Sequence, residues 1–349
     1  TGAVPVTKTT DGFVVLTGTN SYTGLTNIEE GVLVVGSTAA LPGFATPGKV
    51  NVSNGAFLSF IADAGAWSTA DINTAIGAAN FSTMGGFGLH LSTGEEFTYA
   101  DAISGTKSLI KTGDGTLILS GDSSHTGNTI VYQGTLKVGS QNNSVFGTGM
   151  VIVAGGTLDL NGFDLQLGEL VLGGGPVGST ATVTVGSRLL TLRGNVTYQA
   201  DNNPLGAVIS ASVSECAVSL GGQTRQFIVE DSTSADADLT VNAVIVDGIA
   251  PAGIVKLGDG RLVLTAANTF TGPVSVHGGA LSVSSMASLG SAASLNLGAT
   301  LQITGSTAVS IDKNILLTAN GALDITNTAG VTMDGQISGG FNFTKTGAG

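Results

Sequence analysis

The densest group of acidic side chains lies in a polar stretch past the middle of the chain. Its members fall within nine residues and are Glu230, Asp231, Asp236 and Asp238. Carboxylate oxygens are ligands that Ca²⁺ prefers, so this stretch is a candidate calcium loop. The glycine of an EF-hand loop and the G-G-x-G-x-D nonapeptide are both missing. The stretch therefore favours a solvated loop, with calcium as the alternative, and we assign no metal ligand.

Acidic pairs are also the catalytic groups of many polysaccharide-degrading enzymes, in which two carboxyl groups share the acid and base roles. The pairs in this chain are Glu29–Glu30, Glu95–Glu96 and Asp236-x-Asp238. An enzyme groove would combine several acids with a nearby arginine, and the arginines available are Arg188, Arg193 and Arg225. The acidic pairs occur in turn-like segments, which favours solvated corners, and we assign no catalytic residue.

Three other features resemble parts of known sites. The glycine run Gly173–Gly178 resembles a phosphate-binding loop, but no Lys-Ser/Thr pair and no helical pattern follow it, which favours a corner. Trp67 could stack on a sugar ring, although packing against a nearby helix explains it better. Cys216 is the single cysteine, which excludes a disulfide scaffold and a cysteine-rich zinc site, and we expect a buried hydrophobic residue there.

Composition limits the possible partners. The net charge is −12 and Lys plus Arg number only 12, so the basic footprint of a nucleic-acid-binding protein is absent. No apolar run is long enough to span a bilayer, and we expect no membrane insertion by this segment. The start "TGAVPVTKTTDG" lacks the charged and apolar blocks of a signal peptide. No cofactor is indicated.

The elements that position these residues repeat along the chain. The stretch "KTGDGTLILSGDSSHTGNTIVYQGTLKVGS" from Lys111 to Ser140 aligns without gaps with the stretch from Lys8 to Ser37, and 15 of 30 positions are identical. A third copy starts at Lys256, and the opening of a fourth, "KTGAG", starts at Lys345. Self-similarity of this kind predicts a repeat architecture.

Alternation within each copy predicts short strands with one apolar face. The residues expected to point inward are Val14, Leu16, Ile28, Leu33 and Val35 in the first copy, Leu117, Leu119, Val131, Leu136 and Val138 in the second, and Leu262, Leu264, Val276, Leu281 and Val283 in the third. The slot held by Val34, Lys137 and Ser282 should face outward. So should Val15, Ile118 and Val263, which we expect an insertion to cover.

Glycine-marked corners separate these strands. Asp11, Asp114 and Asp259 each precede a glycine, which predicts tight turns and makes these aspartates turn formers. Units of the type G-x-L-x-aliphatic recur about every twenty residues, a plausible length for one coil of a parallel β-helix. Asn20 and Asn268 lie at corners, where we expect stacked amide ladders.

The alignment also argues against catalytic histidines. His125 occupies the slot of Tyr22 and Phe270, and a catalytic residue would not be exchanged so freely between copies. His277 aligns with Glu29 and Tyr132 at a variable outward slot, and His90 alternates outward in "LHLST". No Ser-His-Asp arrangement and no His-x-x-x-His spacing is evident.

The repeat resembles the autotransporter-associated β-strand repeat, also called the passenger-associated transport repeat. The resemblance is carried by "AISGTKSLIKTGDGTLILSG" from Ala102 to Gly121, by "ANTFTGPVSVHGGALSV" from Ala267 to Val283 and by "QISGGFNFTKTGAG" from Gln336 to Gly349. It implies a right-handed parallel β-helix that is exported to the bacterial surface. In the autotransporters of this family a C-terminal β-barrel assists secretion; no barrel-like segment is evident here.

We therefore predict an all-β protein, a right-handed parallel β-helix (solenoid) with a short helical insertion. Residues 1–349 would form a single β-helix segment of a longer chain, with motifs starting near 8, 111, 256 and 345 and insertions at approximately 62–98 and 202–238. In the first insertion, Ser68-x-x-Asp71 predicts the start of a short helix with an Ile72, Ala75 and Ile76 stripe.

The predicted function is that of a structural or adhesive, non-enzymatic solenoid at the bacterial cell surface, associated with the outer membrane. Its expected partners are itself or adjacent repeats, in end-to-end or lateral homo-assembly including filaments, and host or environmental glycans. The alternative is a polysaccharide-binding or polysaccharide-degrading β-helix enzyme.

Overall fold

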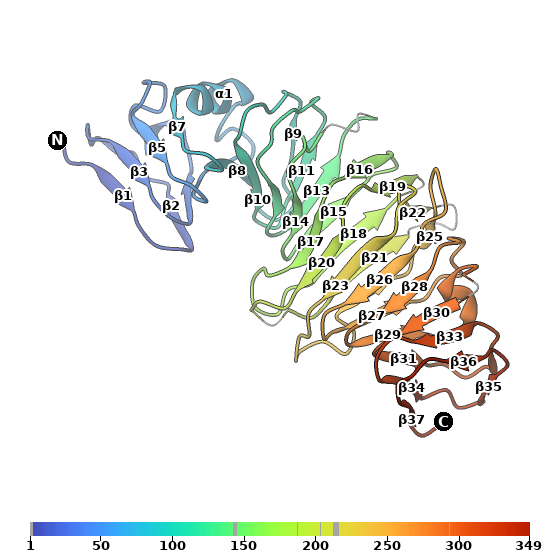
Figure 1. Ribbon diagram of the computed structural model, residues 1–349. Helices are drawn as coiled ribbons and strands as arrows, with labels where there is room; N and C mark the ends of the chain where they lie inside the picture. Colours follow the sequence, from blue (N-terminus) through green and yellow to red (C-terminus); the bar gives the residue numbers. More distant parts are fainter. Residues whose placement is uncertain (1–2, 142–144, 187, 203, 212–215, 293) are drawn as a thin grey trace. The chain divides into compact units, whose positions relative to one another are not determined.

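The computed structural model describes residues 3–141, 145–186, 188–202, 204–211, 216–292 and 294–349. The chain divides into two compact units. The first consists of Thr1–Ile152 with Gly156–Leu158, and the second of Val153–Gly155 with Asp159–Gly349. Each unit is a parallel β-solenoid, as the alternation pattern predicts, and its short strands follow one another around the coil (Figure 1).

The first unit holds the first two motif copies. Its strands are β1 Val6–Lys8, β2 Phe13–Leu16, β3 Thr26–Ile28, β4 Val32–Val35, β5 Val50–Val52, β6 Phe57–Ile61, β7 Asn80–Phe81, β8 Gly86–His90, β9 Glu96–Tyr99, β10 Ser108–Thr112, β11 Thr116–Leu119, β12 Thr129–Val131, β13 Thr135–Val138 and β14 Val151–Val153. The 3-10 helix η1 spans Thr38–Ala40 and the α-helix α1 spans Thr69–Ala78. The strands stack in the orders β1-β3-β5-β7, β2-β4-β6-β8-β10-β12-β14 and β9-β11-β13.

The second unit holds the third copy, and β15 Thr157–Asp159 lies where the two units divide the chain. The other strands are β16 Leu165–Leu167, β17 Leu170–Gly173, β18 Ala181–Val185, β19 Leu189–Leu192, β20 Val196–Gln199, β21 Ala207–Ala211, β22 Ala217–Ser219, β23 Arg225–Val229, β24 Leu239–Val241, β25 Val244–Val246, β26 Ile254–Leu257, β27 Arg261–Leu264, β28 Val274–Val276, β29 Ala280–Val283, β30 Ser294–Leu297, β31 Thr300–Ile303, β32 Val309–Ile311, β33 Asn314–Leu317, β34 Gly321–Ile325, β35 Val331–Met333, β36 Ile337–Ser338 and β37 Phe343–Thr346, with the 3-10 helix η2 at Met286–Leu289.

Two long sheets and two short ones form the faces of the second unit. The long sheets run β17-β20-β23-β26-β28-β30-β33-β36 and β18-β21-β24-β27-β29-β31-β34-β37. The short sheets are β16-β19-β22-β25 and β32-β35. Each coil returns to the next position of the same sheet through strands of the other sheets, so parallel pairing needs no helical crossover.

The cores consist of aliphatic side chains stacked in register from coil to coil. In the second unit Leu262, Leu281 and Leu301 occupy successive positions of one row, and each is fully buried. Burying one such leucine contributes about 2 kcal/mol. Because each row is covered only by the coils above and below it, stability comes from the stacking of neighbours.

The first copy departs from the predicted inward pattern. Val14 is 41% exposed and Leu16 is half-buried, whereas their counterparts Leu117 and Leu119 are buried. The reason is position, because β2 is the outermost strand of its sheet and has a neighbour on one side only.

The outer slots are also not uniformly exposed. Val34 and Ser282, which alternation places outside, are 1% and 3% exposed, while Lys137 is half-buried. The insertion expected over Val15, Ile118 and Val263 is not seen: Val15 is 54% exposed and the other two are half-buried. Alternation gives the direction of a side chain, but cover over the outer face comes from neighbouring coils.

Helix α1 begins where the sequence predicts. The Ser68 hydroxyl accepts a hydrogen bond from the Asp71 backbone N–H at 3.1 Å, which caps the helix. Ile72, Ala75 and Ala78 are buried, and Ile76 is half-buried.

Both predicted insertions contain strands of the solenoid. The stretch 62–98 contains β7, β8 and the start of β9, and the stretch 202–238 contains β21, β22 and β23 among its described residues.

The motif does not stay on one sheet. In the first copy the lysine strand β1 belongs to the sheet β1-β3-β5-β7, and β2 belongs to the sheet that follows. In the second copy the lysine strand β10 lies in the same sheet as β2. Between β8 and β10 the motif is therefore shifted by one face of the solenoid.

Candidate functional site

The lysine that opens each motif copy is part of the interior, not of the surface. Lys111 points inward from β10 and is 0% exposed. Its Nζ donates to the carbonyl oxygens of Thr112, Gly113 and Gln133 at 2.8, 2.7 and 3.2 Å. Gln133 lies one coil further along the chain, so one ammonium group joins two successive coils.

The same arrangement recurs in the second unit. Lys256 is 0% exposed and donates to the carbonyl oxygens of Leu257, Gly258 and Gly278 at 2.9, 2.8 and 3.1 Å. The other motif lysines repeat part of it: Lys8 donates to Thr10 O and Glu30 O, and Lys345 to Gly347 O and Gly349 O. We call this arrangement the lysine corner.

A glycine of the following strand closes the corner. Gly134 has a φ of +70°, and a Cβ atom there would lie 2.3 Å from Gly113 O and 2.8 Å from the Lys111 Nζ. Gly31 repeats this contact, because a Cβ atom there would lie 2.7 Å from the Lys8 Nζ. These glycines are required both by the backbone conformation and by the space that the ammonium group occupies.

Burial has an electrostatic consequence for the lysine corner. Removal from solvent lowers the pKa of Lys111 to about 8, an effect that the nearby Asp114 partly opposes. Burial likewise lowers the pKa of Lys256 to about 8, with Asp238 and Asp259 acting in the opposite direction. Both side chains are therefore mainly ammonium ions at neutral pH and become neutral in mildly alkaline solution.

Strand alternation alone does not predict an interior role for these lysines, because a charged side chain is expected on the outer face of the solenoid. The signal that could have identified them is their presence at the same motif position in all four copies. The outward slot of Lys137 shows the contrast, because it is valine in the first copy and serine in the third.

Three acids of the predicted loop, Asp231, Asp236 and Asp238, line one shallow depression together with Asp259 and Arg261, but they are not placed as a metal site. Asp238 is buried, and its two oxygens accept hydrogen bonds from Ser232 N and Arg261 N, both at 2.7 Å. Glu230 is exposed and accepts from Ala200 N. Asp231 and Asp236 are exposed, and the described residues contain no group of three or more acids, histidines or cysteines placed to hold a metal ion.

The other acidic pairs and the arginines lie apart. Glu29 and Glu30 are exposed, and Glu95 accepts a hydrogen bond from Ala64 N in the loop before α1. Arg225 is buried and donates to the carbonyl oxygens of Leu220 and Arg193. Arg188 is exposed, and Arg193 donates from Nε to Gln166 Oε1 at 2.7 Å.

The histidines have structural or surface positions. His125 is 0% exposed, and its Nε2 lies 3.1 Å from the Thr129 hydroxyl. Burial lowers the pKa of His125. His90 is half-buried with Nδ1 3.1 Å from the Thr112 hydroxyl, and His277 is exposed, in agreement with its variable slot.

Trp67, Cys216 and the glycine run also have structural positions. Trp67 is 3% exposed, donates to Val35 O at 3.0 Å and packs edge-on against Phe44 and Phe60. Cys216 is buried, with its thiol against Gly186 O. Within Gly173–Gly178, three glycines have positive φ and the next element is β18, so the run forms a corner.

The corner asparagines bind backbone instead of one another. Asn20 donates to Ala40 O at 2.8 Å and Asn268 to Ser288 O at 2.6 Å, so each holds the 3-10 turn of the next coil. An amide ladder does occur on the sheet β1-β3-β5-β7, from Asn80 to Asn51 at 3.1 Å and from Asn51 to Asn27 at 2.9 Å. The predicted stacking was thus wrong in its positions, because a carbonyl was available nearby.

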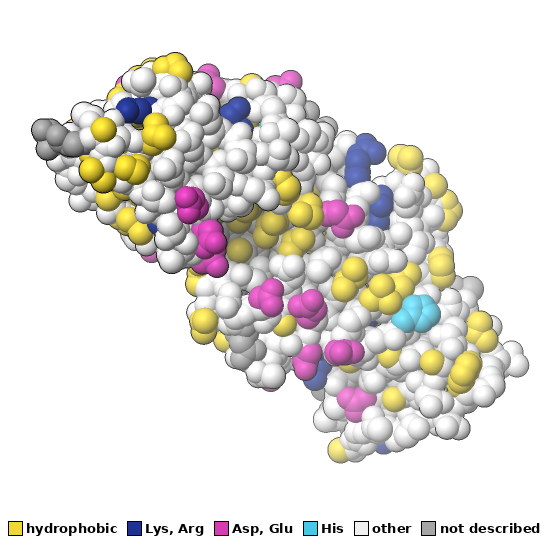
Figure 2. Space-filling view, turned by 60° about the vertical axis from the view of Figure 1, so that its left-hand side comes forward, with side chains coloured by type: hydrophobic (Ala, Val, Ile, Leu, Met, Phe, Trp, Pro, Cys, Tyr) yellow, Lys and Arg dark blue, Asp and Glu magenta, His cyan; other side chains and the backbone are white. Residues whose placement is uncertain are grey.

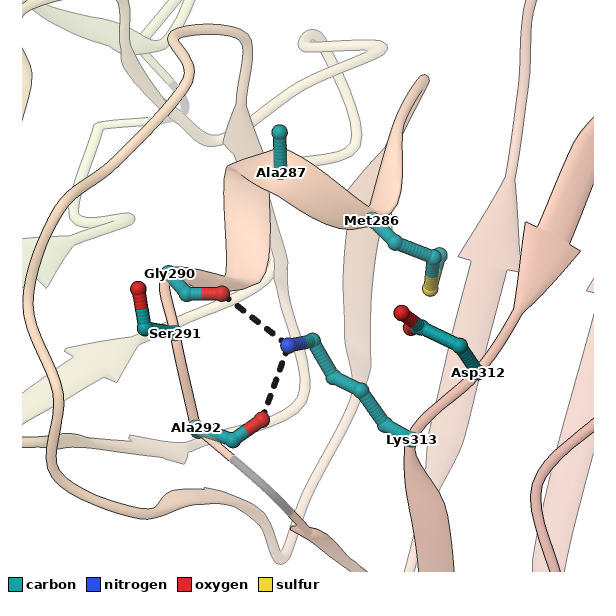
Figure 3. Close-up of a pocket in the computed structure, with 7 residues that line it drawn as sticks. All are labelled: Met286, Ala287, Gly290, Ser291, Ala292, Asp312 and Lys313. Carbon is teal, nitrogen blue, oxygen red and sulfur yellow. Dashed lines mark hydrogen bonds between the residues drawn. The ribbon is translucent and has the colours of Figure 1, made fainter.

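Besides the depression lined by the acidic loop, two further surface depressions of the second unit could receive a ligand. One lies beside η2, and Lys313 points into it but donates to Gly290 O and Ala292 O at 3.0 and 2.8 Å (Figure 3). The other is a groove of about 600 Å³ across the sheet β16-β19-β22-β25. It combines polar and apolar side chains, among them Gln166, Thr191, Arg193, Ser219, Val246 and Ile249.

The visible surface is mostly uncharged. Figure 2 shows scattered Asp and Glu side chains and a smaller number of Lys and Arg side chains, among hydrophobic side chains and the other side chains and backbone drawn in white. Among the described helices none is both long enough and apolar enough to cross a membrane.

Comparisons with known proteins agree with the repeat. The passenger-associated-transport-repeat matches residues 6–35, 109–138 and 254–283. The "Adhesin BmaC autotransporter" of Brucella suis biovar 1 (strain 1330) is 30% identical over 329 residues, which cover 89% of this chain and 8% of that relative. No solved structure matches. The three matched segments coincide with the copies that carry the buried lysine corners, and the chain thus carries three passenger-associated transport repeats within a parallel β-solenoid fold.

Proposed function

We propose that this chain is a non-enzymatic, rigid segment of an exported adhesive passenger at the surface of a bacterium, displayed at the outer membrane. The passenger repeat and the similarity to an autotransporter adhesin support export and adhesion. The chain spans about 8% of that relative's length, so this proposal concerns a segment of such a protein.

One structural observation carries the proposal. Apart from the motif lysines and a few other polar residues, side chains that point inward are kept apolar from coil to coil, while the outer slots change identity freely between copies. Ladders of parallel hydrogen bonds give such a solenoid stiffness along its axis, and its outer positions are free to vary for contact with a ligand. This division suits a protein that must hold a binding surface away from a cell.

The groove on the sheet β16-β19-β22-β25 is the surface that we propose for ligand contact. Arg193, Gln166 and Thr191 offer hydrogen-bonding groups, and Ile249, 96% exposed, offers an apolar lip. Such a mixture fits a glycan, which presents hydroxyl groups on its edges and C–H groups on its faces.

The enzyme alternative has weaker support. A glycosidase needs two carboxyl groups facing one another across the scissile bond. The acid in the groove, Asp247, accepts hydrogen bonds from Thr271 N, the Thr271 hydroxyl and Ala252 N, each at 2.8 Å. Its oxygens are therefore engaged in holding the corner.

Purified chain can be applied to immobilised glycans and to host-cell surface proteins, with product analysis of every glycan in parallel. We expect binding without cleavage, and weaker binding of an Arg193→Ala/Ile249→Asp variant. The matched control is Arg188→Ala, an exposed arginine outside the groove. Cleavage of any glycan would favour the enzyme, and equal binding by both variants would remove the groove from the proposal.

Self-association with adjacent repeats or other copies is a second part of the proposal. The outermost strand of a sheet presents unpaired backbone N–H and C=O groups, which can template another strand. Light scattering and electron micrographs at increasing concentration test this. A monodisperse monomer without filaments would contradict it.

A further inference from the structure

The outer face of one sheet in the first unit is apolar and yet closed to solvent. Val32 and Val34 of β4, Phe57 of β6 and Ile110 of β10 form one cluster, and each is at most 7% exposed. All four point outward by alternation. The partly buried side chains of Ile61, Ile130 and Tyr132 pack against this cluster.

The cover over this face comes from the same sheet. Phe13 of β2 contacts Tyr132, which follows β12, with ring centroids 5.2 Å apart. In the order β2-β4-β6-β8-β10-β12, five steps of about 4.8 Å would separate these strands by about 24 Å in a flat sheet. The sheet must therefore fold back so that its outer face meets itself. We call the apolar contact the seam.

The crease lies at β8. Its outward residues are Gly86, Gly88 and, at its end, His90. A Cβ atom at Gly86 would lie 2.6 Å from the Phe57 ring, and one at Gly88 would lie 2.7 Å from the Ile110 side chain. Two glycines thus allow the side chains of the flanking strands to meet over β8. This is also the place where the motif shifts by one face of the solenoid.

The closed seam buries one polar group that has no hydrogen-bond partner. Ser59 of β6 points outward, is 0% exposed, and its hydroxyl has no hydrogen-bond partner among the described residues. A buried hydroxyl without a partner destabilises the state that buries it, and opening of the seam would return it to water. The edge of the seam is already accessible, since Phe13 and Val15 are 42% and 54% exposed.

The parallel ladder between β8 and β10 joins the two sides of the crease, and His90 Nδ1 lies 3.1 Å from the Thr112 hydroxyl across it; further side-chain contacts lie around α1. The Tyr99 hydroxyl donates to Asn73 Oδ1 at 2.7 Å, and Ser92 donates from its backbone N–H and its hydroxyl to Asp63. These are individual, largely exposed contacts, and contacts of this kind contribute little stability. They tether the two sides without fixing the angle between them.

We propose that the seam is a joint, at which strands β1–β8 swing as one arm against strands β9–β14. In the closed state the apolar cluster is buried and Ser59 is unsatisfied. In the open state the apolar cluster is exposed and Ser59 is hydrated. Burial of four apolar side chains outweighs one unpaired hydroxyl, so the closed state is the major one, and hydration of Ser59 offsets part of the cost of opening.

Spin labels on the full chain measure this motion. Asn54→Cys in the first arm and Thr148→Cys in the second are exposed positions, and Cys216→Ala removes the native thiol. In the parent we expect a main population at the shorter distance and a minor population at the longer one. Val34→Lys places a charge in the seam and should shift the distribution to the longer distance. Ser59→Ala removes the unpaired hydroxyl and should lower the open fraction about tenfold.

The motif itself supplies the matched control. Val34 and Lys137 occupy the same slot, so Lys137→Val is the reverse exchange outside the seam and should leave the distribution unchanged. A single distance in the parent that responds to neither Val34→Lys nor Ser59→Ala would overturn the joint. Loss of the strand signal in circular dichroism for Val34→Lys, with no response to Ser59→Ala, would overturn it as well.

Discussion

The second and third motif copies lie in different units and close their lysine corners in the same way, but they fill the space before their middle strand differently. Lys111 and Lys256 each bind three carbonyl oxygens at nearly equal distances. At the start of the middle strand, β12 or β28, the second copy pairs His125 with Thr129, whereas the third has Phe270 and Val274.

This difference separates two kinds of requirement. The corner carbonyls belong to the backbone and are present whatever the local sequence, so their donor cannot change without loss. The neighbouring pair only has to fill its space and satisfy its own polar atoms. The apolar pair does so fully, whereas the polar pair satisfies His125 Nε2 and the Thr129 hydroxyl and leaves the buried His125 Nδ1 without a partner among the described residues, so both members must change together.

The largest effect is expected from a substitution that removes the lysine corner, the feature that the two copies share. Lys111→Met removes three hydrogen bonds to buried carbonyl oxygens, each worth about 1–3 kcal/mol when left unmade. Relief of the cost of burying the ammonium group offsets part of this loss, so we expect a net destabilisation of about 2–3 kcal/mol. Urea unfolding followed by circular dichroism, with hydrogen exchange to locate the loss, measures it.

The matched control is Lys137→Met, an outward lysine of the same copy, which should change the unfolding free energy by less than about 0.5 kcal/mol. Lys256→Met should reproduce the effect of Lys111→Met in the other unit. Equal stabilities of the Lys111 and Lys137 variants would contradict a structural role for the lysine corner.

The second prediction uses the charge of the same lysines. The pKa of Lys111 and of Lys256 is about 8 in the folded chain and 10.5 without burial. Between these values the unfolded chain binds more protons, so stability should rise with pH from about 8 to 10.5 and fall as pH decreases through that window. We expect a gain of about 1–3 kcal/mol per lysine.

Unfolding at several pH values in the parent and in a Lys111→Met/Lys256→Met double variant tests this gain, because other titrating groups are common to both proteins. The difference in unfolding free energy between the two should grow in favour of the parent across the window. A constant difference would show that the lysines keep their ordinary pKa.

The third prediction sharpens the contrast between the copies. His125→Phe alone should cost about 1 kcal/mol, because the buried Thr129 hydroxyl loses its partner. Adding Thr129→Val recreates the pair of the third copy and should restore most of that loss. A double-mutant cycle by urea unfolding reports the coupling, expected at about 1 kcal/mol. Simple additivity would mean that the two side chains act independently.

The smallest effect is expected at mildly acidic pH. Burial lowers the pKa of His125 below its ordinary 6.5, so the unfolded chain takes up a proton first as the pH falls. Stability contributed by neutral His125 should be present above pH 6.5 and decrease below it. The His125→Phe/Thr129→Val variant should lack this component of the acid dependence. Identical acid profiles would contradict it.

Much of the architecture follows from local pattern. Period-two alternation around Leu117 and Leu136 gives the buried rows, positive-φ glycines such as Gly134 give the corners, and Ser68 gives the start of α1. Because the slot of His125 holds Tyr22 or Phe270 in the other copies, the sequence indicates that this histidine is structural and not catalytic. Each inference needs only neighbours along the chain or the comparison of one copy with another.

The candidate sites were less predictable, because they depend on which coils meet. Asp238 is close in sequence to other acids, but its oxygens are bound to backbone amides from two coils. Arg225 is a candidate arginine by type, but it is buried among carbonyl oxygens. Spacing along the chain cannot show whether a polar group already has a partner on the next coil.

The sequence by itself determined the unit of construction, a coil of short strands whose inward side is aliphatic, since side-chain direction along a strand is a local property. The tertiary structure decided which polar groups are buried and which parts of the outer face are covered. A motif lysine becomes an interior cation only once two coils bring their carbonyl oxygens around it, and an outward valine at position 34 is buried only because the sheet folds back at Gly86 and Gly88.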